Sequence, residues 1–208
     1  MLHKAIALLL LLASLTVRVD AGHGDDLVDV ASLDPTIRID MRYASDRNFL
    51  KQVLYDDSLC LLRRTVAQRL VRVQKALSAR GLGLKVWDAY RPQSVQVKLW
   101  KILPDDRFVA NPAKGSRHSR GAAVDLTLVD AAGNELPMGT DHDEFTTRAY
   151  PGSTDVPVQA QRNRRLLRNA MAAHGFSQMS TEWWHFEAPG ATAYSLLDQP
   201  LSRFRGKR

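Results

Sequence analysis

Cysteine is nearly absent from this sequence, since Cys60 is the only one among 208 residues. A single cysteine excludes an intrachain disulfide, so the core alone must hold the fold. Cys60 lies in the apolar run of residues 59–62, where a small buried side chain is expected rather than a catalytic thiol.

Repeats, low-complexity tracts and obvious linkers are also absent. Apolar residues make up 45% and charged residues 25% of the chain, close to the average for globular proteins, which argues against disorder. We therefore expect one folded domain from about residue 25 onward. The basic residues are not interleaved with aromatic ones, so binding to nucleic acid is not expected.

Long hydrophobic runs are missing apart from one near the first residue. Residues 5–17 form an apolar stretch that follows Lys4 and precedes a small-residue pattern at residues 19–21. This order is typical of a secretory signal peptide, and the stretch is shorter than the roughly 20 residues that span a bilayer. We predict a signal peptide at residues 1–21, a mature domain at residues 22–208 without an integral membrane span, and export to the periplasm or the medium.

The net charge of +7 at pH 7 is moderately basic. Four arginines, at positions 162, 164, 165 and 168, share one predicted helix, and residues 203–208 form a basic tail. These groups suggest a binder of surface polyanions, but a solvated helix face and a frayed terminus are the simpler explanation.

Hydrophobic spacing predicts an α+β fold. Positions 59, 62, 66, 70, 73 and 77 are apolar at helical intervals, and Gly81 marks the end of that helix. Further helices are expected at residues 93–103 and 157–174, and strands at residues 84–87, 122–129, 176–179 and 183–187. This order of elements favours a single domain with a mainly antiparallel central sheet flanked by helices.

Two polar segments, residues 116–128 and 182–185, carry the residue types of a catalytic metal site. A catalytic zinc takes three protein ligands from histidine and carboxylate groups and leaves a fourth position for water. A separate carboxylate then moves a proton from this water to the leaving amine. The candidate ligands are His118, Asp125 and His185, and the candidate base is Glu182.

Asp125 lies in a predicted strand that is otherwise apolar, where an unpaired buried charge would be costly. A metal ion would supply the missing partner. Glu182 and His185 are three residues apart, which would place them on opposite faces of a regular strand. We therefore expect irregular backbone at residues 182–185.

Each histidine, taken alone, is more often a structural or surface residue than a ligand. His174 lies at the end of a predicted helix, where an imidazole can bond to the last carbonyl groups. His142 is the rival ligand, because Asp141 and Asp143 flank it. Loop solvation explains these two acids equally well.

Arg91 ends a predicted strand and precedes a predicted helix, a common place for a site residue. Its guanidinium could hold a carboxylate or stabilise an oxyanion, with Asp88 fixing its orientation. A surface ion pair of little energetic value explains the two residues equally well.

Together these segments resemble the D-alanyl-D-alanine dipeptidase family, the zinc enzymes of the vancomycin-resistance type. The motifs are Ser-x-His-Ser-Arg-Gly-x-Ala-Val-Asp-Leu-Thr-Leu at residues 116–128, Asp-Ala-Tyr-Arg-Pro at residues 88–92 and Glu-x-Trp-His at residues 182–185. The family is related to zinc D,D-carboxypeptidases and to the Hedgehog signalling domain, so a Hedgehog/DD-peptidase-like fold is expected. The resemblance covers residues 39 to 188, approximately.

The resemblance implies one Zn²⁺ per chain, held by His118, Asp125 and His185. It implies that Glu182 is the catalytic base and that Arg91 stabilises the tetrahedral oxyanion. The other residues that it places around the small pocket are Ser116, Asp88, Tyr43 and Asp143. The implied substrate is a small D-amino-acid dipeptide, D-alanyl-D-alanine, which is hydrolysed to two D-alanines.

Two other functions stay open. A zinc D,D-carboxypeptidase would trim the stem peptides of peptidoglycan, and a non-catalytic module would use zinc only to stabilise a surface that binds the cell wall. Resistance enzymes of the dipeptidase type act in the cytoplasm, whereas an exported relative would salvage or trim D-alanyl peptides in the envelope.

Overall fold

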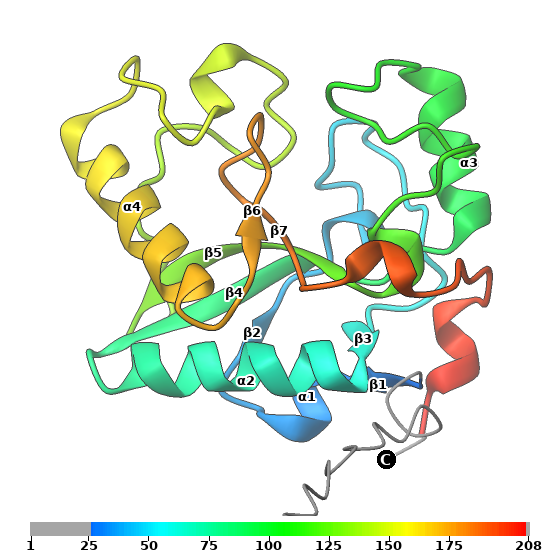
Figure 1. Cartoon of the computed structure of the whole chain (residues 1–208), viewed down its shortest axis with the longest axis horizontal. Helices are drawn as coiled ribbons and strands as arrows, with labels where there is room; N and C mark the ends of the chain where they lie inside the picture. Colours follow the sequence, from blue (N-terminus) through cyan, green and yellow to red (C-terminus); the bar gives the residue numbers. More distant parts are fainter. Residues whose placement is uncertain (1–25, 207–208) are drawn as a thin grey trace, which may run out of the picture.

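The computed structural model of the protein describes residues 26–206 (Figure 1). The predicted signal peptide at residues 1–21 lies outside this part of the chain. No helix within the described part is both long and apolar enough to cross a membrane.

A five-stranded sheet forms the centre of the fold, in the order β2-β4-β5-β7-β6. Its strands are β2 (Arg38–Ile39), β4 (Leu82–Asp88), β5 (Ala123–Asp130), β6 (Ser177–Gln178) and β7 (His185–Glu187). Only β2 and β4 are paired in parallel, and the other three neighbouring pairs are antiparallel. The prediction of an α+β domain with a mainly antiparallel sheet is confirmed.

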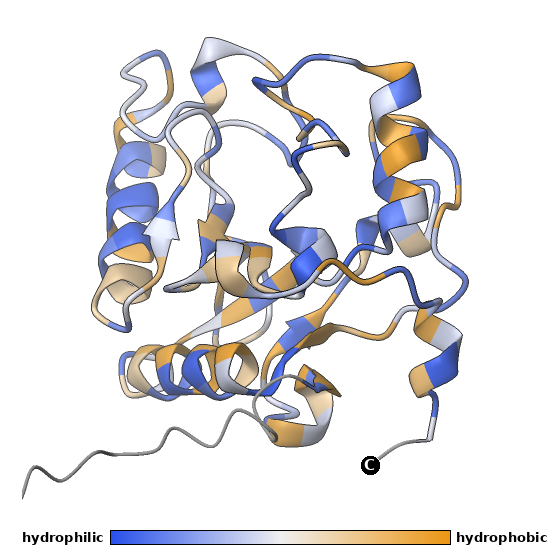
Figure 2. Cartoon of the chain, turned by 45° about the vertical axis from the view of Figure 1, so that its right-hand side comes forward, coloured by the Kyte–Doolittle hydropathy of each residue, from blue (hydrophilic) through white to orange (hydrophobic). Residues whose placement is uncertain are grey.

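Within residues 26–206, four α-helices surround the sheet: α1 (Val30–Leu33), α2 (Arg64–Ser78), α3 (Gln93–Ile102) and α4 (Val158–Ala172). Helix α2 packs against β4 and α4, and it buries the apolar positions whose spacing predicted it, including Val66, Leu70 and Leu77. Its outer positions are basic or polar, so Figure 2 shows α2 and α4 with mixed hydrophilic and hydrophobic residues. This amphipathic pattern explains why both helices lie at the edge of the core.

The start of α2 differs from the prediction of a helix from residue 59. Residues Leu61–Arg63 form strand β3, which pairs with β1 (Leu27–Asp29) in a separate two-stranded sheet. A short buried strand and a buried helical turn have the same apolar composition, so spacing alone could not separate them. Cys60 precedes β3 and is fully buried, as predicted.

The segment between β6 and β7 is irregular. Residues 179–184 form bends and turns, and β7 begins at His185. The prediction of irregular backbone at residues 182–185 is confirmed for its first three residues. The turn allows Glu182 and His185 to line the same cavity, which a continuous strand would prevent.

Candidate active site

Strand pairing brings Asp125 and His185 together. The two residues are direct partners in the β5–β7 ladder, so their side chains lie on the same face of the sheet. The Nδ1 atom of His185 lies 2.9 Å from the Oδ1 atom of Asp125. The register of this one strand pair thus brings together two residues that lie 60 positions apart in the sequence.

His118 enters the same site from a 3-10 turn, His118–Arg120, that precedes β5. Its Nε2 atom lies 3.1 Å from His185 Nδ1 and 3.4 Å from Asp125 Oδ1. Gly121 closes the turn at φ 66°, and a Cβ atom on it would lie 2.6 Å from the Leu27 side chain. Only glycine fits this turn, which sets the position of His118 relative to β5.

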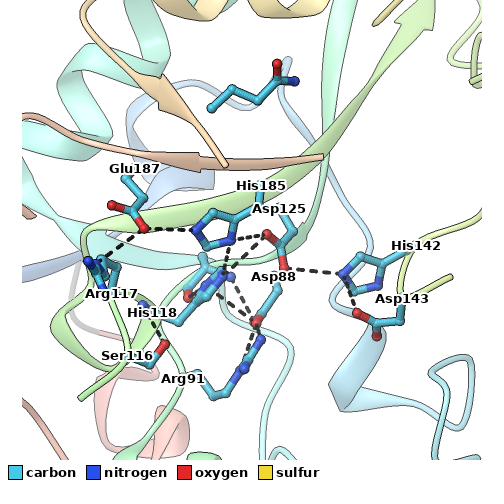
Figure 3. Close-up of polar contacts among 12 residues, drawn as sticks. Asp88, Arg91, Ser116, Arg117, His118, Asp125, His142, Asp143, His185 and Glu187 are labelled. Carbon is cyan, nitrogen blue, oxygen red and sulfur yellow. Dashed lines mark hydrogen bonds and ion pairs between the residues drawn. The ribbon is translucent and has the colours of Figure 1, made fainter. Parts of the chain in front are cut away.

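Hydrogen bonds on the far side of each imidazole select the nitrogen that faces the site. His118 Nδ1 donates to the carbonyl oxygen of Ala89 at 2.7 Å, because a carbonyl can only accept, and this leaves Nε2 free. His185 Nε2 lies 3.5 Å from Glu187 Oε1, which directs Nδ1 toward Asp125. Figure 3 shows both imidazoles turned toward the Asp125 carboxylate.

The three donor atoms fit a metal ion. His118, Asp125 and His185 are all buried, and each offers a ligand atom within 4.8 Å of the others. Ligand atoms of a tetrahedral zinc with bonds of about 2.0–2.1 Å stand about 3.3 Å apart, close to the observed separations. The 3.1 Å separation of the two imidazole nitrogens therefore allows one cation to contact both of them.

The electrostatics of the site also favour a positive charge. Burial opposes a charge on His185, yet the Asp125 and Glu187 carboxylates raise the pKa of its imidazole to about 10. Burial likewise opposes ionisation of Asp125, but the histidines around it, His118 foremost, hold the pKa of its carboxyl well below the usual range. A site that retains a carboxylate and attracts a proton also attracts a metal ion.

Glu182 lies in the same cavity as the three candidate ligands. Its side chain is almost fully buried, and burial raises the pKa of its carboxyl to about 8, with Asp125 and Asp143 adding to the effect. A carboxyl with a pKa near neutrality can accept and return a proton within one reaction cycle. This property suits a general base and acid.

Arg91 is buried and does not form a surface ion pair, so that alternative is wrong. Its Nε and Nη2 atoms donate to Asp88 Oδ2 at 3.0 and 2.5 Å, and Nη1 donates to Gln96 Oε1 at 2.8 Å. Asp88 in turn accepts from the Tyr55 hydroxyl at 2.5 Å. The guanidinium, which also lies over the Tyr43 ring, is held in one orientation at the cavity wall.

Tyr43, Ser116 and Asp143 line the remaining walls of the cavity, whose volume is about 280 Å³. The Tyr43 hydroxyl donates to Asp143 Oδ2 at 3.0 Å. The Ser116 hydroxyl accepts from the backbone N–H of His118 at 3.2 Å. The structure therefore brings all nine candidate residues named from the sequence into one site or, for Asp88, directly behind it.

Three residues of this site were given no role by the sequence reasoning. Gln96 holds Arg91, while Glu187 lies between His185 and Arg117, whose Nε is 3.3 Å from Glu187 Oε1. Gln96 and Glu187 lie outside the motifs and Arg117 fills a variable position between Ser116 and His118, so only the folded structure reveals the contacts of these three residues. His142, the rival ligand, is outside the three-residue group identified among the described residues.

Arg164 belongs neither to a polyanion-binding surface nor to a solvated helix face, because it is buried. Its guanidinium donates to the carbonyl oxygens of Met138 and Arg148 at 2.7 and 2.8 Å. Burial lowers the pKa of this group to about 10. Arg164 thus ties α4 to the loop of residues 137–150, which carries Asp143 into the cavity.

Comparison with known proteins places these observations in a family. A peptidase family model described as D-ala-D-ala dipeptidase matches residues 23–206. The D-alanyl-D-alanine dipeptidase of Escherichia coli (strain K12) is 42% identical over 179 residues, covering 86% of this chain and 93% of the relative. The D-alanyl-D-alanine dipeptidase of Streptomyces coelicolor is 35% identical over 201 residues, covering 85% of this chain and 98% of the relative.

Among solved structures, VanYB in complex with D-Alanine-D-Alanine is similar at 18% sequence identity and a TM-score of 0.42. The likeness covers 64% of this chain and 75% of that chain.

Proposed function

The chain belongs to the D-ala-D-ala dipeptidase family of metallopeptidases, and we propose that it hydrolyses D-alanyl-D-alanine to two molecules of D-alanine. One observation carries the proposal. Two imidazole nitrogens and a carboxylate oxygen converge at 2.9–3.4 Å in a small cavity that also holds Glu182 and Arg91.

We propose that the resident metal is a single Zn²⁺, held by His118 Nε2, Asp125 Oδ1 and His185 Nδ1. Two imidazoles and one carboxylate form a donor set that zinc accepts readily. When bound, zinc acts as a Lewis acid that polarises the scissile carbonyl and makes water a better nucleophile near neutral pH. The backbone carbonyl of Ala89 and the carboxylate of Glu187 orient the two imidazoles for this role.

Glu182 moves the proton during hydrolysis. Its carboxylate takes a proton from the attacking water as the oxygen bonds to the carbonyl carbon. It then gives that proton to the nitrogen of the scissile amide, so that the carbon–nitrogen bond breaks and a neutral amine leaves. The same group serves as base and then as acid because burial keeps its proton affinity near the middle of the pH scale.

Arg91 stabilises the negative charge that develops on the carbonyl oxygen. Asp88 and Gln96 hold its guanidinium before substrate arrives, so little reorganisation is needed at the transition state. Asp143, on a wall that it shares with Tyr43, is the carboxylate available for the free ammonium group of a dipeptide. The reacting carbonyl group and the amino end of a short substrate then each have a partner.

Aromatic side chains close one side of the cavity. The Phe145 ring lies 5.0 Å from both Phe108 and Phe49, and Phe108 and Phe145 line the cavity. A volume of about 280 Å³ suits a small ligand better than a longer peptide. The small size of the cavity favours a dipeptidase over a carboxypeptidase that trims stem peptides.

A substrate panel tests the proposed function. With zinc present, we expect hydrolysis of D-alanyl-D-alanine among the four alanyl-alanine stereoisomers. We expect kcat/KM for a pentapeptide ending in D-alanyl-D-alanine to be lower by about 10²-fold or more, because its extra residues collide with the closed wall. Amino acid release is measured by chromatography. Preference for the pentapeptide would assign the chain to the carboxypeptidases instead.

We also propose that the protein is exported and acts on envelope peptides. The support is the apolar stretch of residues 5–17 with its basic start and small-residue end. Expression of the full chain in a bacterial host should give a periplasmic or secreted protein whose first residue is near Gly22, as determined by N-terminal sequencing of each fraction. A cytosolic protein that retains residues 1–21 would contradict export and leave the dipeptidase assignment intact.

A further inference from the structure

His142 lies beside the metal site but takes no part in the mechanism above. Its side chain is only 3% exposed. Three aromatic rings enclose it, with centroid distances of 6.2 Å to Tyr43, 5.3 Å to Trp87 and 5.6 Å to Trp184. A loop histidine surrounded in this way is not a solvated group, so loop solvation does not explain His142 or Asp143, whereas Asp141 is exposed.

The two oxygens of Asp125 face different partners. Oδ1 lies 2.9 Å from His185 Nδ1 and 3.4 Å from His118 Nε2. Oδ2 lies 3.3 Å from His142 Nε2. Figure 3 shows the imidazoles of His118 and His185 on one side of this carboxylate and His142 on the other. His142 is therefore next to a ligand, on the oxygen directed away from the donor cluster.

His142 also touches the wall opposite the metal ligands. Its Nε2 atom lies 3.4 Å from Asp143 Oδ1, while Asp143 Oδ2 accepts from the Tyr43 hydroxyl. Asp143 has a left-handed backbone at φ 60°, which is uncommon for a residue other than glycine. The consecutive side chains of His142 and Asp143 are both buried at the site. A regular strand would turn them to opposite faces, so this left-handed backbone accompanies an arrangement that a strand does not allow.

We propose that His142 is a positioning residue that hydrogen-bonds Asp125 Oδ2 through Nε2–H and keeps Oδ1 turned toward the metal. A carboxylate ligand without such a partner can rotate or exchange its two oxygens, which weakens its hold on the ion. Partners of this kind commonly change metal affinity by about 10- to 100-fold. The inference rests on the metal site of the proposed function and goes beyond its ligand set.

The test compares two replacements of His142. His142→Phe keeps an aromatic ring among Tyr43, Trp87 and Trp184 but removes the donor, whereas His142→Gln restores an N–H at a similar reach. The zinc dissociation constant is measured by competition with a chromophoric chelator, and the cobalt-substituted proteins are compared by their visible absorption. We expect His142→Phe to weaken zinc binding by about 10- to 100-fold and to alter the cobalt spectrum, and His142→Gln to recover most of both.

The matched control is His174→Phe, since the only hydrogen bond found for the His174 imidazole within the described residues is to the Ala170 carbonyl of α4. This variant should bind zinc like the wild type. Equal zinc affinity in His142→Phe and the wild type would overturn the inference. A much larger loss that glutamine does not restore would make His142 a ligand and would overturn it as well. Absence of stoichiometric zinc in the wild type would instead contradict the proposed metal site.

Discussion

Replacing Glu182 with glutamine is expected to reduce kcat for D-alanyl-D-alanine by about 10²- to 10⁴-fold while zinc stays bound at one ion per chain. Glutamine has the same shape but cannot accept a proton from water or return one to the amine. The three metal ligands are unchanged, so this variant should lose catalytic activity while it keeps its zinc. The measurements are kcat from D-alanine release and zinc content by atomic emission.

Stability provides the control for this variant. Burial raises the pKa of Glu182 from 4.5 to about 8 in the metal-free fold, so ionisation of this group opposes folding as the pH rises from about 4.5 to about 8. Glutamine removes that penalty, and the Tm of metal-free Glu182→Gln at pH 8 should not fall below that of the wild type. Full activity in a well-folded variant would remove Glu182 from the mechanism. An inactive wild type with zinc bound would favour the non-catalytic module.

Replacing His118 with alanine is expected to abolish stoichiometric zinc binding and to lower kcat/KM by about 10³-fold or more. The loss follows from the several kcal/mol of transition-state stabilisation that a Lewis acid supplies. Zinc content and D-alanine release are measured after dialysis against a chelator and again after zinc is restored. Added zinc should reactivate the wild type and leave His118→Ala inactive.

His174→Ala is the matched control, because it removes another imidazole that does not line the cavity of the donor cluster, and it should retain zinc and activity. Two results would contradict the assigned ligand set: a His118→Ala protein that keeps a full zinc complement, or a wild type that stays fully active when its metal content falls to zero. Because His118 Nδ1 also bonds to Ala89, the Tm of both variants is needed to exclude unfolding.

The three longer helices, α2, α3 and α4, and the strands β4, β5, β6 and β7 were predictable because each lies in a segment with its own hydrophobic pattern. The short elements α1, β1, β2 and β3 were not predicted. Helix α2 and strand β5 lie within a few residues of their predicted positions. The start of α2 was not predictable, since Leu61 and Leu62 suit a buried strand and a buried helical turn equally well. The pairing of β3 with β1 depends on a segment more than thirty residues away.

The environment of charged side chains was harder to predict than their chemistry. The sequence left Arg91 and Asp88 open between a site pair and a surface pair, and only their burial decides the matter. The sequence favours a solvated helix face for Arg164 and leaves His142 open between a rival ligand and part of a solvated loop, although the side chains of both are buried. Burial depends on which parts of the fold pack over a residue. The sequence around Arg91, Asp88, Arg164 and His142 gives no sign of this packing.

The amino-acid sequence alone determined which donor groups this protein possesses and that a glycine turn precedes the strand of Asp125, because residue type and local backbone freedom do not depend on distant contacts. The tertiary structure alone decided that Asp125 stands opposite His185, which oxygen of Asp125 meets the imidazoles and which meets His142, and that Glu182 shares their cavity. These facts depend on the register between strands far apart in the chain, where a shift of one residue would turn every side chain to the other face of the sheet.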